Sequence, residues 1–304
     1  MSRSYIIRSV SQGDLQSIKN LLTFEGCVHR HMDWREAQDW IGFPPYLILE
    51  SIDSPTTSKA ETSRKPLKLE LAMLACPPDP GEVAWIRIFA FLPTLIRPRE
   101  AWELLWPPVQ AALVEACVQD AAALVAERPW MENNLQSSGF KHTHNVVSLI
   151  REATSPPFPR KYNGLLIRIM REEDIPDVQA VDRACFPILW QYSATTLRLA
   201  YRTARYASIA IIEGQIAAYQ ITSPSTIGSH LSRLAVLPAM QGRGIGYQLT
   251  QDMLQRMNQE GTSYITVNTQ DYNSASIALY HNLGFREDGY CFPVYEIPIT
   301  EEPL

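Results

Sequence analysis

The stretch LAVLPAMQGRGIGYQL, residues 234–249, places three glycines directly after an apolar run typical of a strand and directly before a run with helical periodicity. Glycine between a strand and a helix indicates a sharp backbone bend or the close approach of a bulky polar ligand. The first N–H groups of a helix have no intrahelical acceptor, and the helix dipole favours negative charge beside them. Gly242, Gly244 and Gly246 therefore predict an anion-binding loop, to which the guanidinium of Arg243 can contribute.

Two nucleotide-binding motifs do not fit this loop. A P-loop ends in Gly-Lys-Ser or Gly-Lys-Thr, whereas the sequence here is Gly246-Tyr247-Gln248. A dinucleotide-binding fingerprint has the spacing G-x-G-x-x-G after the first strand of its unit. Here the spacing is G-x-G-x-G, and the preceding strand is the fourth expected in its half of the chain. The loop is therefore predicted to bind a different class of anionic ligand.

The residues around the loop predict a mixed sheet with helices, in the order β-α-β-β-β-α-β-α-β. Apolar side chains recur every four residues after the glycines, which is typical of a helix with one buried face. The later elements are expected as a hairpin at 206–223, a strand at 229–237, a helix ending at Gly261, a strand at 264–268, a helix from Asn273 or Ser274 to Gly284, and a strand at 290–299.

Two motifs in this half resemble those of the GNAT superfamily of acyl-CoA-dependent N-acyltransferases. The first is QGRGIG at 241–246, preceded by LAVLP, which matches the Gln/Arg-x-x-Gly-x-Gly/Ala loop of that family. The second, NSASIALYHNLGF at 273–285, matches the family's next motif at Asn273, Ser276, Leu279, Tyr280, Gly284 and Phe285. The resemblance covers about residues 164–299, and the occurrence of both motifs in order makes it specific.

The resemblance implies a site for acetyl-CoA, its cosubstrate, and a reaction. In that family the backbone at Leu234, Ala235 and Val236 would pair with the pantetheine arm, and an N–H of the same strand would stabilise the oxyanion of the thioester. Tyr280 would protonate the leaving thiolate. The remaining cofactor-binding residues implied by the motifs are Gln241, Gly242, Arg243, Gly244, Ile245, Gly246 and Tyr247 around the pyrophosphate, and Asn273 on the next helix.

A general base for the acceptor amine is the missing part of this site. Some relatives carry a glutamate on the strand before the asparagine motif, and the matching residue here is Asn268, which cannot accept a proton. Glu213, His230, Asp271 or a chain of water molecules could take its place, and the sequence does not select among them. The expected function is transfer of an acetyl group to a primary amine, of a small molecule or a peptide N-terminus, by direct transfer. A non-catalytic acyl-CoA-binding or sensing protein is the alternative.

The chain is expected to contain two related domains. Ile7-Arg8 and Asp14-Leu15 recur 160 residues later as Ile167-Arg168 and Asp174-Ile175, and FAFLP at 89–93 recurs 145 residues later as LAVLP at 234–238. We therefore predict an α/β (α+β) chain of two tandem GNAT-like domains, each a mixed, mostly antiparallel sheet flanked by helices. Its predicted parts are a degenerate, non-catalytic domain at 1–152, a proline-rich linker at 153–163 and a catalytic domain at 164–304.

The first half lacks the residues that would form a second site. The counterparts of Gly242, Arg243 and Gly244 are Arg97, Pro98 and Arg99, and proline has no N–H to offer an anion. The counterparts of Gly246, Asn273 and Tyr280 are Ala101, Arg128 and Leu135. The first half is therefore predicted to keep the fold without the site, the alternative being that Arg97 and Arg99 bind an anion through their side chains.

Composition excludes several other classes. The 304 residues have a formal net charge of −5 and a pI near 5.7, which disfavours a nucleic-acid partner. No run reaches the ~18–20 apolar residues of a membrane span, and the five cysteines are scattered, so a cytoplasmic protein with reduced thiols is expected. The histidine pairs at 29/31 and 142/144 have no third ligand nearby, so no metal is predicted. The stretch ACFPILWQYS at 184–193 is similar over a few residues to ribosomal-protein alanine N-acetyltransferases.

Overall fold

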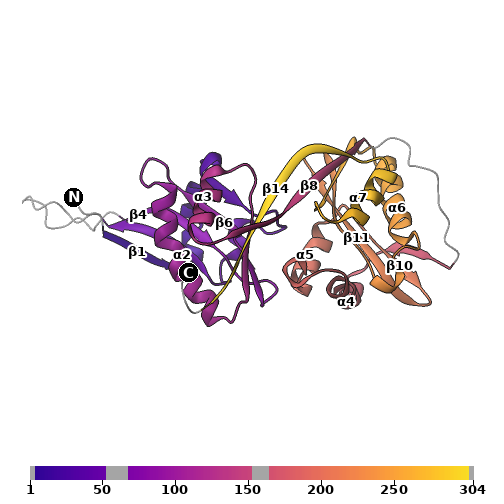
Figure 1. Cartoon of the computed structure of the whole chain (residues 1–304), viewed down its shortest axis with the longest axis horizontal. Helices are drawn as coiled ribbons and strands as arrows, with labels where there is room; N and C mark the ends of the chain where they lie inside the picture. The colour runs from indigo at the N-terminus through magenta and orange to yellow at the C-terminus, as the bar shows by residue number, and fades with distance from the viewer. Residues whose placement is uncertain (1–3, 53–67, 153–163, 301–304) are drawn as a thin grey trace, which may run out of the picture. The chain divides into compact units, whose positions relative to one another are not determined.

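The computed structural model describes residues 4–52, 68–152 and 164–300. The chain divides into two compact units, Met1–Thr143 with Pro293–Leu304, and His144–Phe292 (Figure 1). The predicted linker at 153–163 lies outside the described residues. No helix among the described residues is both long and apolar enough to cross a lipid bilayer.

The first unit has a five-stranded antiparallel sheet in the order β1-β3-β4-β6-β2 and a second set of strands in the order β5-β7-β14. Its strands are β1 (Ser4–Ser9), β2 (Val28–Arg30), β3 (Tyr46–Ile52), β4 (Lys68–Ala75), β5 (Val83–Trp85), β6 (Ile88–Phe91), β7 (Asp120–Leu124) and the end of β14 (Arg286–Pro298). Its helices are α1 (Leu15–Leu21), α2 (Pro98–Glu115) and α3 (Pro129–Ser137).

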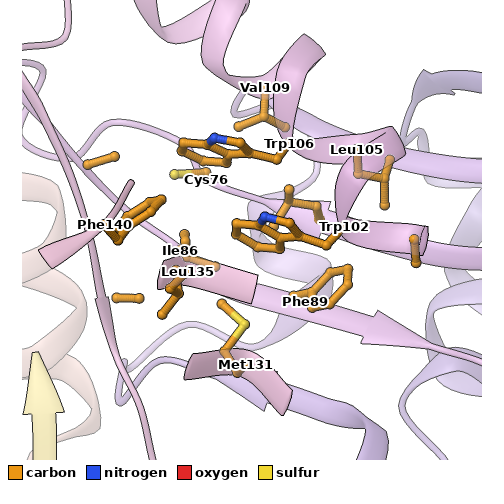
Figure 2. Packing of buried hydrophobic residues seen from close by; sticks show 14 of the residues in the cluster. Cys76, Ile86, Phe89, Trp102, Leu105, Trp106, Val109, Met131, Leu135 and Phe140 are labelled. Carbon is orange, nitrogen blue, oxygen red and sulfur yellow. The ribbon is translucent and has the colours of Figure 1, made fainter. Parts of the chain in front are cut away.

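The core of the first unit is built around α2. The indole rings of Trp102 and Trp106 stack with their centroids 5.3 Å apart and their planes at 7° (Figure 2). Phe89 of β6 meets Trp102 edge-on, and Phe140 packs against Trp106. Leu135 of α3 is fully buried in the same cluster, so apolar side chains fill this part of the unit.

The second unit has a mixed sheet in the order β8-β13-β12-β11-β10-β9, in which β12 and β13 are parallel and the other neighbours antiparallel. Its strands are β9 (Leu166–Ile169), β10 (Tyr206–Ile212), β11 (Gln215–Ser225), β12 (Gly228–Val236), β13 (Tyr264–Gln270) and most of β8 (Lys141–Glu152). Its helices are α4 (Ile175–Cys185), α5 (Ala194–Thr203), α6 (Ile245–Gln259) and α7 (Ser274–Asn282). The predicted order of elements is confirmed, with α5 as an additional helix.

The two halves repeat one ion pair in the same local setting. Arg8 in β1 donates two hydrogen bonds to Asp14, at 2.8 and 2.6 Å, and Arg168 in β9 donates two to Asp174, both at 2.7 Å. In each half the aspartate also accepts a hydrogen bond from a backbone N–H at the start of its helical turn. The arginine holds the pKa of Asp174 below its usual value. The aligned residues thus tie the first strand to the first helix in both halves.

The last strand of each half pairs within the other unit, which the predicted boundaries did not anticipate. Residues 146–152 of β8 pair with β13, and residues 294–298 of β14 pair with β7. The predicted boundaries at 152 and 164 assign β8 to the first domain and β14 to the second. In the structure most of β8 belongs to the second unit, and the end of β14 belongs to the first. Strand pairing depends on contacts distant in sequence, so the pattern within each half carries no information about this exchange.

A buried histidine in β2 makes the stability of the fold depend on pH. His29 is 2% exposed, and burial lowers its pKa to about 4. The unfolded chain therefore binds one more proton than the folded one between pH ~6.5 and the folded pKa, so stability falls as the pH falls through that range. We expect a loss of about 3 kcal/mol, since each pKa unit corresponds to about 1.4 kcal/mol.

Urea unfolding between pH 4 and 7 checks this prediction. His29→Gln should flatten the slope, because the amide keeps a donor for the carbonyl of Ile86, which lies 3.2 Å from Nε2 of the histidine. His281→Gln is the control, because that side chain is half exposed on α7. An unchanged slope in His29→Gln would contradict the prediction.

Candidate functional site

Strands β12 and β13 separate part-way along their length. Their parallel register runs from Gly228–Tyr264 to Leu231–Val267 and ends there. At that point the register between β12 and β11 shifts, because Leu231 lies opposite Thr222 but Arg233 lies opposite Ile221. Ser232 is therefore the extra residue of a β-bulge, which bends a strand and increases its twist. Over 232–236 the side of β12 that faced β13 has no ladder partner in the described part of the chain.

The three residues predicted to pair with a pantetheine arm do not face the same way. Leu237 N donates a hydrogen bond to Ala217 O at 2.9 Å, so the backbone of Leu237 faces β11. In an antiparallel pair every second residue faces the partner strand in this way, and the next one before Leu237 is Ala235. The backbone of Ala235 consequently faces β11, which corrects its predicted role. The backbone groups of Leu234 and Val236 face the open side. Their side chains pack against Ile245 and Leu249 of α6.

The loop after β12 is shaped by two glycines in the left-handed region. Gly242 has φ +73° and Gly244 has φ +79°, and a Cβ at either would meet no atom within 4 Å. Gly244 is the N-cap of α6, and the first helical hydrogen bond runs from Gln248 N to Gly244 O at 3.1 Å. Within the described residues the N–H groups of 242–246 have no backbone acceptor. Successive free N–H groups in such a turn form a concave anion site.

The other predicted loop residues divide between the core and the surface. The side chains of Ile245 and Tyr247 are buried, so only their main chains face the loop. The side chains of Gln241 and Arg243 are exposed. Gln241 Nε2 donates to the carbonyl of Val236 at 2.9 Å, which ties the loop to the open edge of β12.

Gly246 has a different role from the one predicted. It is helical, and a Cβ there would lie 3.4 Å from Cγ2 of Val236 and 3.5 Å from Cδ2 of Leu279. The position therefore packs against β12 and α7 with room for a Cβ, and its missing side chain does not clear a path to the loop.

We expect Gly246→Ala to leave the free energy of unfolding unchanged or to raise it by up to about 1 kcal/mol. Alanine has the higher helix propensity, and both distances from the added Cβ are ordinary van der Waals contacts. Gly242→Ala should instead lose about 1 kcal/mol or more, because alanine is strained at φ +73°. Chemical unfolding of both variants checks the contrast, and a larger loss in Gly246→Ala would contradict it.

The second predicted motif begins α7 and supplies a buried tyrosine. Asn273 is the N-cap of α7, and its Oδ1 accepts a hydrogen bond from Ser276 N at 3.1 Å. This contact gives the asparagine a structural role at the start of α7, and its contact with a cofactor stays a prediction. Tyr280 is 4% exposed, with its ring 5.7 Å from that of Phe285. Burial raises the pKa of Tyr280, so its phenol stays protonated.

The family model of the acetyltransferase (GNAT) family matches residues 175–285 of the chain. Residues 175–285 form a GNAT domain. The matched segment includes the open edge of β12, the glycine loop and Tyr280. The predicted resemblance is therefore confirmed for the part of the chain that carries the site.

Two curated proteins show how far the sequence similarity extends. The ribosomal protein bS18 alanine N-acetyltransferase of Escherichia coli K12 is 31% identical over 84 residues, which are 27% of this chain and 57% of that protein. The protein of the same name from Salmonella typhimurium is 27% identical over 122 residues, 40% of this chain and 80% of its own length. The chain thus spans 57% of the length of the first curated relatives that it matches.

Solved structures extend the similarity to both halves. A GCN5-related N-acetyltransferase from Sphaerobacter thermophilus has a TM-score of 0.63 at 13% identity, over 97% of this chain and 96% of that one. A tandem GNAT protein from the clavulanic acid biosynthesis pathway also has a TM-score of 0.63 at 13% identity, over 99% of this chain and all of that one. These similarities confirm the predicted fold class of two tandem GNAT-like domains.

Two of the proposed bases of the GNAT domain lie on loops. Glu213 is exposed in the turn between β10 and β11, beyond the Val236 end of β12. Asp271 follows β13, and its carboxylate accepts hydrogen bonds from the backbone and side chain of Asn145 at 3.2 and 2.9 Å. Both hydrogen bonds go to Oδ2, so one of its two carboxylate oxygens is already engaged within the protein.

The third proposed base lies on the sheet. His230 of β12 pairs in register with Thr266 of β13, and its Nδ1 lies 2.8 Å from the threonine Oγ1. Asn268 is two residues further along β13, so its side chain is on the same face. Burial lowers the pKa of His230 to about 4, so the imidazole is neutral near pH 7. Of the three side chains, His230 lies nearest in register to the position where a relative would carry its glutamate.

In the first half, the residues at the corresponding helix start are unsuited to an anion. Arg97 is the N-cap of α2, and Pro98 at its first position has no N–H. Glu100 in the first turn accepts a hydrogen bond from the hydroxyl of Tyr5 at 2.7 Å, and its negative charge disfavours an anion near this helix start. Arg99 pairs with Glu103 at 2.7 Å. These contacts favour the predicted loss of the site over binding by the two arginines.

The predicted histidine pairs are packing residues in the structure. The ring of His31 stacks on Trp85 at 4.6 Å, and His142 lies 5.6 Å from Tyr295. His144 meets the rings of Trp190 and Tyr272 at 5.8 and 5.2 Å. The described parts of the chain contain no group of three or more His, Cys, Asp or Glu side chains placed to hold a metal ion.

A buried arginine next to the open edge had no signal in the sequence. Arg233 is 7% exposed, and it pairs with Asp182 of α4, which is fully buried. The hydroxyl of Tyr219 in β11 donates to the same carboxylate. Nothing in the local spacing links residues 51 positions apart, so only the fold brings this pair together.

Proposed function

We propose that the GNAT domain transfers an acetyl group from acetyl-CoA directly to a primary amine. The observation that carries the proposal is the open edge of β12 leading into a loop of free N–H groups at 242–246. Such a loop at a helix start suits a diphosphate, and an unpaired strand edge suits an amide-containing arm. Acetyl-CoA has both parts, and when bound it supplies the thioester.

The residues of the domain would act on the reaction in three ways. The N–H of Leu234 or Val236 would donate a hydrogen bond to the developing oxyanion of the thioester carbonyl. Tyr280, kept protonated by burial, would give its proton to the leaving thiolate. His230 is our candidate for accepting a proton from the amine, because it lies on the sheet beside Asn268. Its lowered pKa makes it a weak base, so it would accept that proton only as the nitrogen becomes acidic on attacking the thioester.

An alanine at a peptide N-terminus is the first acceptor to test. The curated relatives are named for alanine N-acetylation of a ribosomal protein, and they match the half of the chain that carries the site. Release of free thiol from acetyl-CoA should be measured over a panel of N-terminal peptides and small amines. We expect turnover with at least one of them. Binding of acetyl-CoA without turnover of any amine would contradict catalysis.

A non-catalytic acyl-CoA-binding protein is the second candidate, and Asn268 is the observation that favours it. An amide cannot accept the proton that the attacking amine must lose. The two candidates differ in the effect of His230→Gln, which should abolish turnover in a catalyst that uses the imidazole and should leave acetyl-CoA binding unchanged in either case.

We also retain cytoplasmic location as a prediction, because the cysteines are free thiols in the structure.

A further inference from the structure

The segment that follows α4 is held against β12 by the side chain of one arginine. Arg233 donates to Oδ2 of Asp182 from Nε at 2.8 Å and from Nη2 at 2.7 Å. The same Nη2 donates to the carbonyl oxygen of Trp190. The guanidinium thus links the end of α4 to a backbone group further along the chain, and the guanidinium and the carboxylate are both buried.

Two aromatic rings of the same segment enclose the guanidinium. Its central carbon lies 3.4 Å from the ring centroid of Phe186 and 4.1 Å from that of Tyr192. The second carboxylate oxygen of Asp182 accepts a hydrogen bond from the backbone N–H of Tyr192 at 2.9 Å. Residues 186–192 are therefore fixed at both ends and at Trp190, by one cation and its counter-ion.

The segment held in this way borders the open edge of β12. Arg233 is next in sequence to Leu234, whose backbone faces that edge. Cys185, at the end of α4, donates from Sγ to the carbonyl oxygen of Val236 at 3.1 Å. A group bound along 234–236 would consequently lie beside residues 185–192.

We propose that Arg233 is a positioning residue that holds residues 186–192 in place as a wall of the acceptor site. The proposal rests on the proposed function, since an acceptor amine must reach the thioester beside this edge. The arginine would act through the segment and would touch neither substrate. A planar guanidinium suits this role because it can bind a carboxylate with two N–H groups while aromatic rings pack against it.

The first half shows the same combination of groups. Arg87 follows the interruption between β5 and β6, and its Nη1 lies 2.9 Å from Asp33, with both side chains more than nine-tenths buried. The guanidinium carbon is 4.8 Å from the ring centroid of Trp40. An arginine beside an irregularity in a strand, a buried aspartate and an aromatic ring therefore occur together in both units, next to the bulge of β12 in one and between β5 and β6 in the other.

Arg233→Lys and Tyr192→Leu test the proposal by separate means. Lysine keeps the charge but loses the second hydrogen bond and the planar stacking, and leucine removes one ring while keeping the arginine. In both variants we expect KM for the acceptor to rise at least tenfold and the Kd for acetyl-CoA to change less than twofold. Arg205→Lys is the control, because Arg205 makes a partly exposed ion pair with Glu260 at 3.0 Å.

Hydrogen exchange provides a second readout that needs no acceptor. The amides of 186–192 should exchange at least tenfold faster in Arg233→Lys than in the wild type, while those of β13 and α6 stay as protected as before. Unchanged exchange in 186–192, or an equal loss of protection throughout the unit, would overturn the proposal. The proposal would also be overturned if the wild type is active and both variants have the same KM for the acceptor as the wild type. Absence of turnover in the wild type would refute the proposed function alone, because the exchange result stands independently.

Discussion

Gly244→Asp should weaken acetyl-CoA binding by at least a hundredfold and leave the protein folded. Gly244 has φ +79° and caps α6, and a Cβ there would point into open space. Aspartate tolerates the left-handed region better than most residues, so the variant should lose about 1 kcal/mol of stability and stay folded. Its carboxylate would stand beside the N–H groups that we propose for the diphosphate. Two like charges 4 Å apart repel by about 4 kcal/mol near a protein surface, equivalent to about a thousandfold in Kd.

Gly244→Asn is the matched control for this prediction. Asparagine has nearly the same volume and backbone preference as aspartate but carries no charge. Calorimetric titration of both variants with acetyl-CoA should show a much smaller loss of affinity for the amide than for the acid. Equal affinities of the two variants, or wild-type affinity in Gly244→Asp, would mean that the diphosphate binds elsewhere.

Tyr280→Phe should lower kcat by about a hundredfold and leave the Kd for acetyl-CoA unchanged. General acid catalysis typically contributes a factor of about 100 to 10,000. The variant removes the hydroxyl and keeps the ring that packs on Phe285. Because burial raises the pKa of Tyr280, the phenol should stay protonated below pH 10, and no loss of activity with rising pH should be due to its ionisation.

Tyr206→Phe controls for the loss of a tyrosine hydroxyl in the same unit. Tyr206 packs at the edge of the cluster that contains Tyr280, and its hydroxyl donates to Asp252 at 2.7 Å. It should lose some stability without a change in kcat. Single-turnover measurements with saturating acetyl-CoA compare the two variants. If kcat falls equally in both, Tyr280 has only a structural role.

Local patterns predicted the elements that depend on local physics. Helix α6 begins directly after Gly244 and ends at Gln259, with Gly261 at φ +70° shortly after it, because its apolar face and its terminal glycine are both visible in the sequence. The repeated spacing of arginine and aspartate in the two halves, at 8/14 and 168/174, corresponds to the same ion pair in each. Short-range spacing was sufficient in these cases because the interacting residues lie within one strand-turn-helix unit.

The parts that the sequence did not reveal depend on pairing between distant residues. The bulge at Ser232 alters which backbone groups of β12 face the open side, and it removed Ala235 from the predicted set. The exchange of β8 and β14 and the pair of Arg233 with Asp182 join residues far apart in the chain. Gly246 resembled a loop glycine by spacing, and only the structure shows that it lies within α6, packed against side chains of β12 and α7.

The most direct test of the central claim compares acetyl-CoA with acetyl-pantetheine, which lacks the diphosphate together with the 3′-phosphorylated adenosine, by calorimetry on the wild-type chain. Hydrogen bonds to charged groups contribute about 1.5–3 kcal/mol each, so losing two of them should cost a factor of at least about 100 in Kd. We predict one acetyl-CoA per chain, and acetyl-pantetheine bound at least a hundredfold more weakly. Equal affinities for the two compounds, two sites per chain, or no binding of acetyl-CoA would contradict the assignment of the diphosphate to the free N–H groups of 242–246.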